Sequence, residues 1–516
     1  MAETRVTTAA EDYPQTAEDH PRPSGAPAAT APPQSGADPD RPADPPKSQG
    51  SGLLLVVVMT ATFMALMDSF IVNVAAPSIR TDMNASFSQV ELVISGYVLV
   101  YGLLLITGGR LGDIKGYRPL FIGGVALFTL ASFACGIAPS PATLIAFRVA
   151  QAIGAALFYP QVLSILQTAF TGARRTRAFA VFGATIGGAS IAGQLLGGVL
   201  IQADLWGLSW RPIFLVNVPI GVLVIAGALV TLPHTRGEST TRLDLRGTLL
   251  LSAALLLLSV PLTEGHATGW PAWTWIMLIA SVPAFAAFVA WQRRLSGRGG
   301  FPLTPPALFT RRTFTGGNIL AVAFFAGNAG LFFILALHLQ FGLGYSALEA
   351  GLTFTPLAVT FVAASLLAPK WAPKLGSHVL TLGYVINVIG TLALLITLLV
   401  EGSDASGVTM IWALAVIGFG EGLGVSPLFG AVLNGVPTKD AGSASGVLET
   451  SGQVGMSLGI TGVGLVFFSV LGDATDLDSY ADAFTWGLVG NAVLSLIALA
   501  LVPYLTGKDK NPAGTA

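Results

Sequence analysis

Residues 108–120 read GGRLGDIKGYRPL, a short glycine-rich segment that carries Asp113, Lys115 and Arg118. It lies between two long apolar runs, 90–111 and 119–138. A helix needs about 20 apolar residues to cross a bilayer, and charged side chains are costly inside one. The segment therefore predicts a turn at a membrane surface between two spanning helices.

A weaker copy of this segment occurs in the second half of the chain. Residues 109–123, GRLGDIKGYRPLFIG, align without gaps with residues 369–383, PKWAPKLGSHVLTLG, and Gly116 falls on Gly376. Repeated halves are a common construction of secondary transporters. The alternative is chance similarity between two glycine-rich loops.

Fourteen runs along the chain are long and apolar enough to cross a membrane. They cover residues 53–79, 90–111, 119–138, 142–166, 178–202, 213–232, 245–262, 273–292, 315–341, 347–368, 378–400, 408–430, 444–471 and 484–505. If the seventh and eighth runs are an insertion, the two similar segments occupy the same loop of two six-helix halves.

The loop charges test this count. With a cytoplasmic N-terminus, the cytoplasmic loops hold almost all loop Lys and Arg, whereas the outer loops hold only Arg80 and Arg211. Acids gather in the outer loops, at Glu401, Asp404, Asp473, Asp476, Asp478 and Asp482. Lys and Arg concentrate on the cytoplasmic side of membrane proteins. The sequence thus predicts fourteen spans with both termini cytoplasmic.

The overall composition supports a membrane protein and excludes other classes. Of the 516 residues, 53% are hydrophobic and 10% are charged, against about 25% charged in a soluble domain. A net charge of −1 gives no basic face for nucleic acid. The single cysteine, Cys135, permits no disulfide framework. We expect no metal and no cofactor.

Several motifs resemble the major facilitator superfamily, in particular its fourteen-spanner drug:proton antiporters. Gly109, Asp113, Lys115, Gly116 and Arg118 fill the places of that family's loop signature. The first run, LMDSFIVNVAAPSI, resembles the antiporters' first-span motif, and LIAFRVAQAIGAALFYP the fourth-span motif with its Arg148. The segment WRPIFLVNVPIG resembles the opening of the sixth span.

The resemblance implies an all-α membrane protein with the major facilitator fold, two six-helix bundles plus two extra linker spans. The expected parts are a disordered cytoplasmic tail, an N-terminal bundle, two additional helices, a C-terminal bundle and a cytoplasmic C-terminus, at 1–52, 53–232, 245–292, 315–505 and 506–516. It further implies a monomer in the plasma membrane that binds a small-molecule substrate and protons. The loop signature, with Asp113, would act in gating.

The fifth run departs from the antiporter pattern. That family normally has Gly-Pro before a Gly-Gly pair, whereas here Gly193 precedes Gln194, followed by Gly197 and Gly198. The glycines allow close helix packing, but the missing proline removes the kink it would favour. This departure bears on transport direction and not on the fold.

Four charged residues lie inside the apolar runs, at Asp68, Arg148, Glu421 and Glu449. Intramembrane charge is expensive and usually functional. We interpret Asp68 as a proton or cation site tuned by Arg148, and Glu421 and Glu449 as further proton-coupling candidates. The alternatives are a structural ion pair for the first two and a solvated inner-end residue for Glu449.

Uncharged polar and aromatic residues could line a cargo pathway. The candidates are Asn73, Tyr97, Tyr101, Gln151, Tyr159, Asn318 and Asn328, with Gln161, His338 and Gln340 as further positions. A mostly apolar cavity with aromatic side chains and few acids suits lipophilic cargo.

Three functions are compatible with these features to different degrees. The leading hypothesis is a proton-coupled exporter of small lipophilic or cationic drugs or antibiotics, working by alternating access. The second is an importer or lipid transporter on the same fold, supported only by the fifth-run departure. A membrane enzyme is disfavoured, because the sequence has no Walker loop, no HExxH motif and no credible Ser-His-Asp set among five histidines.

Overall fold

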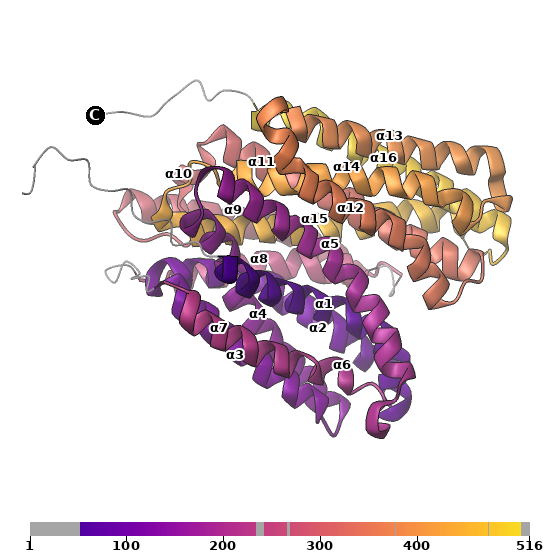
Figure 1. The fold of residues 1–516 in the computed structure, drawn as a ribbon, viewed down its shortest axis with the longest axis horizontal. Coiled ribbons are helices and arrows are strands. Elements are labelled where there is room, and N and C mark those ends of the chain that lie inside the picture. Colours follow the sequence, from indigo (N-terminus) through magenta and orange to yellow (C-terminus); the bar gives the residue numbers. More distant parts are fainter. Residues whose placement is uncertain (1–51, 234–241, 266–268, 377, 473, 507–516) are drawn as a thin grey trace, which may run out of the picture. The chain divides into compact units, whose positions relative to one another are not determined.

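The computed structural model describes residues 52–233, 242–265, 269–376, 378–472 and 474–506 (Figure 1). All regular structure in these residues is helical, and fourteen helical segments are long and apolar enough to cross a membrane. This confirms the predicted all-α class and the count of spans. The predicted tails, 1–52 and 506–516, lie almost entirely outside the described residues.

The helices of the first half and the two extra helices follow the predicted runs closely. They are α1 Gly52–Asp82, α2 Phe87–Lys115, α3 Tyr117–Gly136, α4 Pro141–Ala169, α5 Gly172–Gln202, the short η1 Leu205–Gly207, α6 Pro212–Leu215, α7 Asn217–Thr231, α8 Leu245–Glu264 and α9 Ala272–Gly297.

The helices after the two extra spans also follow the predicted runs. They are α10 Pro306–Phe309, α11 Arg312–Leu337, the π-helical η2 His338–Gly342, α12 Ala347–Leu375, α13 His378–Glu401, η3 Gly402–Asp404, α14 Gly407–Leu433, η4 Thr438–Asp440, α15 Ala441–Leu471 and α16 Leu477–Thr506.

The two similar segments are shorter turns than the sequence suggested. Helix α2 continues to Lys115 and α3 begins at Tyr117, so Gly116 alone makes the turn, with φ at +92°. Helix α12 likewise continues beyond its apolar run to Leu375, and Gly376 follows with φ at +56°. A positive φ favours glycine because it has no Cβ. Both aligned glycines therefore follow the end of a helix with a positive φ, at equivalent places in the two halves.

The sixth predicted span is two helices instead of one. Helix α6 ends at Leu215 and α7 begins at Asn217. Pro219 lacks a backbone N–H and cannot donate to the carbonyl of Leu215, so the helical ladder is interrupted at this point. The break places Asn217 at a helix start inside the bundle.

Four helices begin with the same capping box. Ser86, Ser140, Ser346 and Ser406 precede α2, α4, α12 and α14, and each hydroxyl accepts from the backbone N–H three residues later. A capping box satisfies backbone donors that a helix start leaves unpaired. These are the second and fourth long helices of each half, so the repeat extends to the helix ends.

The contacts between helices also repeat from the first half to the second. Helix α4 packs on α2 and α3 and α5 packs on α1, just as α14 packs on α12 and α13 and α15 packs on α11. Between the halves, α2 contacts α15 and α5 contacts α12, which are equivalent pairs under the repeat. The exact bounds of the predicted domains stay a prediction.

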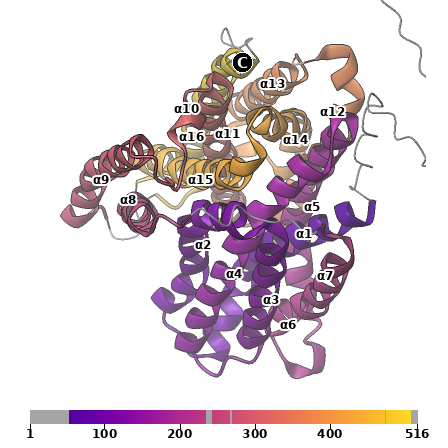
Figure 2. The same ribbon diagram turned by 90° about the vertical axis from the view of Figure 1, so that its left-hand side faces the viewer.

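The two extra helices form a hairpin beside both halves. Helices α8 and α9 pack on each other, and α8 also contacts α2 and α15 (Figure 2). Asp244, before α8, accepts from Trp291 Nε1 at 3.0 Å and Gln292 Nε2 at 2.8 Å on α9. Thr461 of α15 donates to the carbonyl of Leu262 at 2.8 Å. The hairpin is thus fixed internally and attached to α15.

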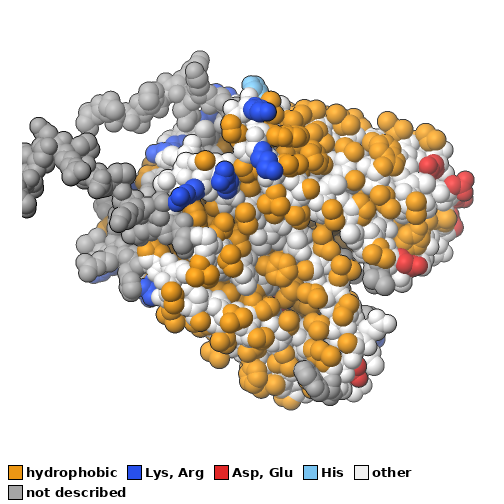
Figure 3. Space-filling view, in the orientation of Figure 1, with side chains coloured by type: hydrophobic (Ala, Val, Ile, Leu, Met, Phe, Trp, Pro, Cys, Tyr) orange, Lys and Arg blue, Asp and Glu red, His pale blue; other side chains and the backbone are white. Residues whose placement is uncertain are grey.

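Charged side chains are separated along one visible face. Figure 3 shows a largely hydrophobic surface with Lys and Arg gathered toward one end and Asp and Glu at the other. The hydrophobic middle is the surface expected where lipid chains surround a membrane protein.

Candidate functional site

A buried ion pair joins the first and fourth helices of the first half. Asp68 of α1 and Arg148 of α4 are completely or almost completely buried, and Arg148 Nη1 lies 2.6 Å from Asp68 Oδ2. The same guanidinium donates through Nε to the carbonyl of Val93 at 3.1 Å. Removing one member of a buried pair leaves the other charge uncompensated.

Three uncharged side chains complete this network. Gln151 Nε2 and Asn217 Nδ2 each donate to Asp68 Oδ1 at 2.8 Å. Both also donate to the Ser132 hydroxyl, at 3.1 and 3.0 Å. The Asp68 carboxylate therefore accepts from three side chains on two other helices, Arg148 and Gln151 of α4 and Asn217 of α7.

The fifth-run glycines hold α5 against this network. A Cβ at Gly193 would lie 2.8 Å from Phe70 Cβ and 2.9 Å from the carbonyl oxygen of Met67. One at Gly197 would lie 3.0 Å from Ile71. Gly198 has no atom within 4 Å of such a Cβ. Two of the three glycines therefore permit close approach beside Asp68.

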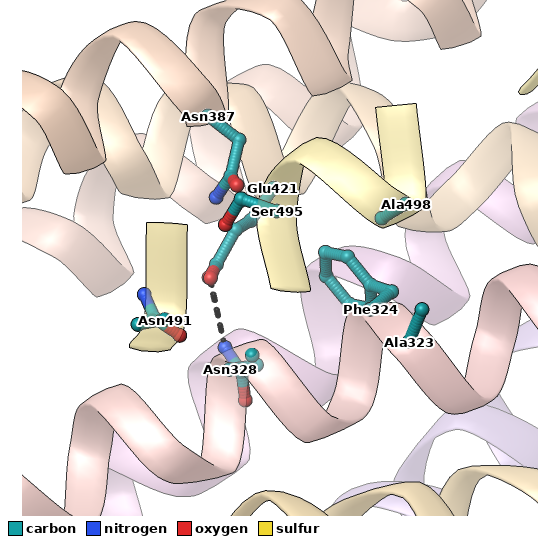
Figure 4. A pocket seen from close by; sticks show the side chains of 9 residues that line it. Ala323, Phe324, Asn328, Asn387, Glu421, Asn491, Ser495 and Ala498 are labelled. Atoms are coloured by element: carbon teal, nitrogen blue, oxygen red, sulfur yellow. Dashed lines mark hydrogen bonds between the residues drawn. The ribbon is translucent and has the colours of Figure 1, made fainter. Parts of the chain in front are cut away.

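A second buried acid occupies a small cavity in the other half. Glu421 of α14 accepts from Asn328 Nδ2 of α11 at 3.0 Å through each carboxylate oxygen. Asn387, Asn491 and Ser495 line the same cavity (Figure 4). Its volume of about 10 Å³ is close to the room one water needs. In this conformation the cavity has room for water and not for cargo.

The third acid, Glu449, lies near the contact between the halves. It is 9% exposed on α15, and its Oε1 has no hydrogen-bond partner among the described residues. It lies close enough to Tyr101 and Tyr159 of the first half to interact with them electrostatically. In this conformation Glu449 is therefore buried, and it is not a solvated residue at the inner end of its helix.

An unbroken series of aromatic rings connects the two halves. Tyr97 lies under the Arg148 guanidinium at 4.1 Å and stacks on Tyr101, whose ring lies 5.9 Å from Tyr159. From Tyr159 the series continues through Phe182, Phe429, Phe325, Phe324 and Tyr384, with centroid separations of 5.2–6.4 Å. Phe324 lines the Glu421 cavity. The series therefore runs from the Asp68 network to the second acid.

The loop signature ties the first half to the start of α15. Asp113 accepts from the backbone N–H groups of Gly442 at 2.7 Å and Ser443 at 2.9 Å. Helix starts carry partial positive charge, so a carboxylate is favoured there. Tyr117 adds a bond to the carbonyl of Thr438 at 2.7 Å. We call this contact the Asp113 lock.

Other members of the loop signature take different places. Gly109 packs so tightly on Gly442 that a Cβ would collide with the Gly442 carbonyl. Arg118 donates to the carbonyl of Leu229 at 2.7 Å, within its own half. Lys115 is exposed. Within the part of the chain that the structure describes, Gly109 and Asp113 of the predicted set therefore contact the second half.

Three further candidate residues, Asn318, Asn73 and Gln194, remain to be placed. Asn318 of α11 accepts from Ser451 of α15 at 2.9 Å, which joins the two helices, and it donates to the carbonyl of Phe314 in its own helix. The side chains of Asn73 and Gln194 lie outside the part that the structure describes. The structure tests the place of each residue but not its role.

Several site residues were missed by sequence reasoning. Asn217 lies in the segment that resembles the sixth-span motif, which is a signal for it, whereas Ser132 lies in an ordinary apolar run without one. Gln167 of α4 donates to the carbonyls of Leu433 at 2.6 Å and Val436 at 3.3 Å. It reinforces the Asp113 lock from the end of α14, and no local pattern indicates it.

An ion pair fixes the opposite end of the first half. Arg211 Nη1 lies 2.7 Å from Asp82 Oδ2, and Trp210 Nε1 donates to the same oxygen at 3.0 Å. Hydrogen bonding from the Arg211 guanidinium holds the pKa of the Asp82 carboxyl below its usual range. The pair joins the end of α1 to the segment that leads into α6.

Comparison with known proteins extends over most of the chain. The pattern of the Major Facilitator Superfamily matches residues 58–460. The probable actinorhodin transporter of Streptomyces coelicolor is 38% identical over 459 residues, covering 88% of this chain and 79% of that protein. The cephamycin export protein of Amycolatopsis lactamdurans is 36% identical over 472 residues, covering 89% and 93%. The crystal structure of the human organic anion transporter TETRAN has a TM-score of 0.62 at 14% identity, covering 89% of this chain and 100% of that chain.

Proposed function

The chain belongs to the major facilitator superfamily, a family of transporters, and from this membership we propose that it exports small lipophilic or cationic antibiotics in exchange for protons. The observation that carries this proposal is the similarity, over 88% and 89% of the chain, to proteins named for actinorhodin transport and cephamycin export. The aromatic series between the halves supports an aromatic or lipophilic cargo, because such rings bury apolar surface at low entropic cost.

Protons would couple to transport through the buried acids. Each half has a polar link from its first to its fourth long helix, Asp68 to Arg148 and Asn328 to Glu421. Protonation of an acid removes its charge and weakens the hydrogen bonds that a carboxylate accepts. The helices that these bonds join could then move relative to each other, which is the requirement for alternating access.

The Asp113 lock would close one side of the pathway in the conformation described. Cargo would therefore be released on the opposite side, where Asp82 and Arg211 lie. We place both termini in the cytoplasm and the protein in the plasma membrane as a monomer. The support is the gathering of Lys and Arg toward one end of the molecule (Figure 3).

The test is a panel of dyes and antibiotics offered to inverted membrane vesicles with and without a proton gradient. Proton-driven export predicts uptake into these vesicles that stops when an ionophore dissipates the gradient. Uptake that persists without the gradient rejects proton coupling. Accumulation only in right-side-out vesicles would support the importer suggested by the fifth-run departure.

A further inference from the structure

An apolar groove opens between α1 and α5, close to the ends where both helices begin. Val56, Thr60 and Phe63 line it from α1, and Val181 and Thr185 from α5. Its volume is about 330 Å³. Val56 is 60% exposed, so the groove opens to the surface of the molecule.

Two arginines of α5 lie between the groove and the start of that helix. Arg177 is four residues before Val181, and Arg174 is seven before it, so all lie on one stripe of α5 with Thr185. Arg174 and Arg177 are exposed. From Arg177 to Thr185 the helix rises about 12 Å. One elongated molecule could reach from the arginines into the groove.

Two lysines of the other half lie at the same level. Helices α5 and α12 run antiparallel, since Gly187 lies against Phe361 and Gly183 against Ser365. Continuing that register along both helix axes puts Arg174 and Lys374 at the same level, each on the exposed face of its helix, about half a turn around from the contact positions Gly183 and Ser365. Lys370 is one turn away on α12, and both lysines are exposed. Four exposed basic side chains therefore lie near this level, two on each helix.

We propose that these four residues and the groove bind one anionic phospholipid of the leaflet on the side where α5 begins. The phosphate would lie between Arg174, Arg177, Lys370 and Lys374, because guanidinium groups match phosphate oxygens and basic pockets between helices attract anionic headgroups. An acyl chain would fill the groove. A phospholipid matches this arrangement in charge and polarity. Its anionic headgroup would meet the basic residues, and its apolar chain would meet the adjoining groove.

The bound lipid would stabilise the conformation described. Helices α5 and α12 belong to different halves, so one phosphate held by both would strengthen their contact. The inference rests on the proposed membrane orientation, which places the site in the cytoplasmic leaflet. It does not depend on which cargo is carried or on proton coupling.

The test measures lipid binding to the full-length protein in detergent by native mass spectrometry and by the unfolding temperature. The probes are dioleoyl phosphatidylglycerol, dioleoyl phosphatidylcholine and soluble glycerol 3-phosphate. We expect one tightly retained phosphatidylglycerol and a raised unfolding temperature, with neither effect from the other two. Equal retention of both lipids, or an equal effect of glycerol 3-phosphate, would overturn the proposal.

Two variant pairs test the headgroup and the chain separately. R174Q/R177Q should weaken phosphatidylglycerol binding at least tenfold, whereas R293Q/R294Q, with the same charge loss on exposed α9 positions, should not. Thr185→Phe should fill the groove and weaken binding, whereas Val199→Phe, on an exposed position of α5, should not. Equal losses in both members of a pair indicate nonspecific attraction and reject the site.

The same variants separate this inference from the proposed export function. If Thr185→Phe weakens cargo binding and leaves lipid binding unchanged, the groove takes cargo and the lipid proposal is wrong. If phosphatidylglycerol binds as expected but no antibiotic is transported, the export function fails and the lipid site stands.

Discussion

At the scale of the residue, the three buried acids differ in how well their charge is satisfied. Asp68 accepts from Arg148, Gln151 and Asn217, whereas among the described side chains Glu421 accepts from Asn328 alone. Glu449 has one oxygen without a partner among the described residues. A charge that is fully paired is more stable than one that is not. We therefore expect different roles for the three acids.

Asp68→Asn should abolish proton-coupled transport while the protein still inserts into the membrane. The substitution also leaves Arg148 buried without its counter-charge, which costs about 3–5 kcal/mol in known buried pairs. The double variant Asp68→Asn with Arg148→Gln is the control, because it removes both charges. We expect it to recover most of the unfolding temperature but none of the coupled uptake in vesicles. Normal coupled transport by Asp68→Asn would reduce the pair to a structural role.

Asp82→Asn should destabilise the protein at neutral pH but not in acid. Because Arg211 lowers the pKa of Asp82 in the folded state, the stabilisation is complete above the unfolded pKa of about 3.9 and is lost as the pH falls through the folded pKa. The side chains are 26% and 39% exposed, so the effect should not exceed about 1 kcal/mol. Unfolding temperatures of both proteins should differ by a constant amount from pH 5 to 8 and converge in acid. A difference that changes between pH 5 and 8 would contradict this assignment.

At the scale of the element, glycines decide how closely helices approach. Gly193 and Gly197 let α5 approach α1 beside Asp68, and Gly109 lets α2 approach the start of α15. Small residues at helix contacts are the usual means of packing in membranes. The altered fifth-run motif keeps this function without its proline.

Gly193→Ala should lower the unfolding temperature, whereas Gly198→Ala should leave it unchanged or raise it. The new Cβ at position 193 would lie 2.8 Å from Phe70 Cβ, so α1 or α5 must move. Overpacking of this kind costs about 1–3 kcal/mol. At position 198 no atom lies within 4 Å, which makes this variant a matched control. Equal effects of the two substitutions would show that packing on α1 is not what the glycine provides.

At the scale of the whole molecule, the two halves meet through equivalent helix pairs and are fastened at one end. The Asp113 lock and Gln167 bind the backbone at the start of α15 and at the end of α14, on both sides of the segment 434–440. Both bonds join a side chain of the first half to main-chain atoms of the second. Opening of this end therefore requires their loss.

Asp113→Asn should open this end of the molecule more often. Asparagine retains an acceptor but not the charge that favours the start of α15. Spin labels at Lys115 and Lys439, both exposed and on opposite sides of the lock, would report a shift to longer distances in a Cys135→Ser background. Asp476→Asn, an acid outside the lock, is the control and should give the wild-type distribution. An unchanged distribution in Asp113→Asn would show that the lock does not limit opening.

The sequence by itself determined the fourteen helices, the separation of loop charges and the embedded acids, because apolar length and the cost of buried charge are local properties that a single chain segment displays. Even the turn at Gly116 and its equivalent at Gly376 were indicated by an internal alignment. Only the tertiary structure decided which atoms meet: Asn217 with Asp68, Asn328 with Glu421, Gly442 with Asp113. These partners are 93 to 329 residues apart, and helix packing brings them together without leaving a pattern in either segment alone. For the same reason the basic cluster beside the groove of α1 and α5 emerged only when α12 was placed against α5.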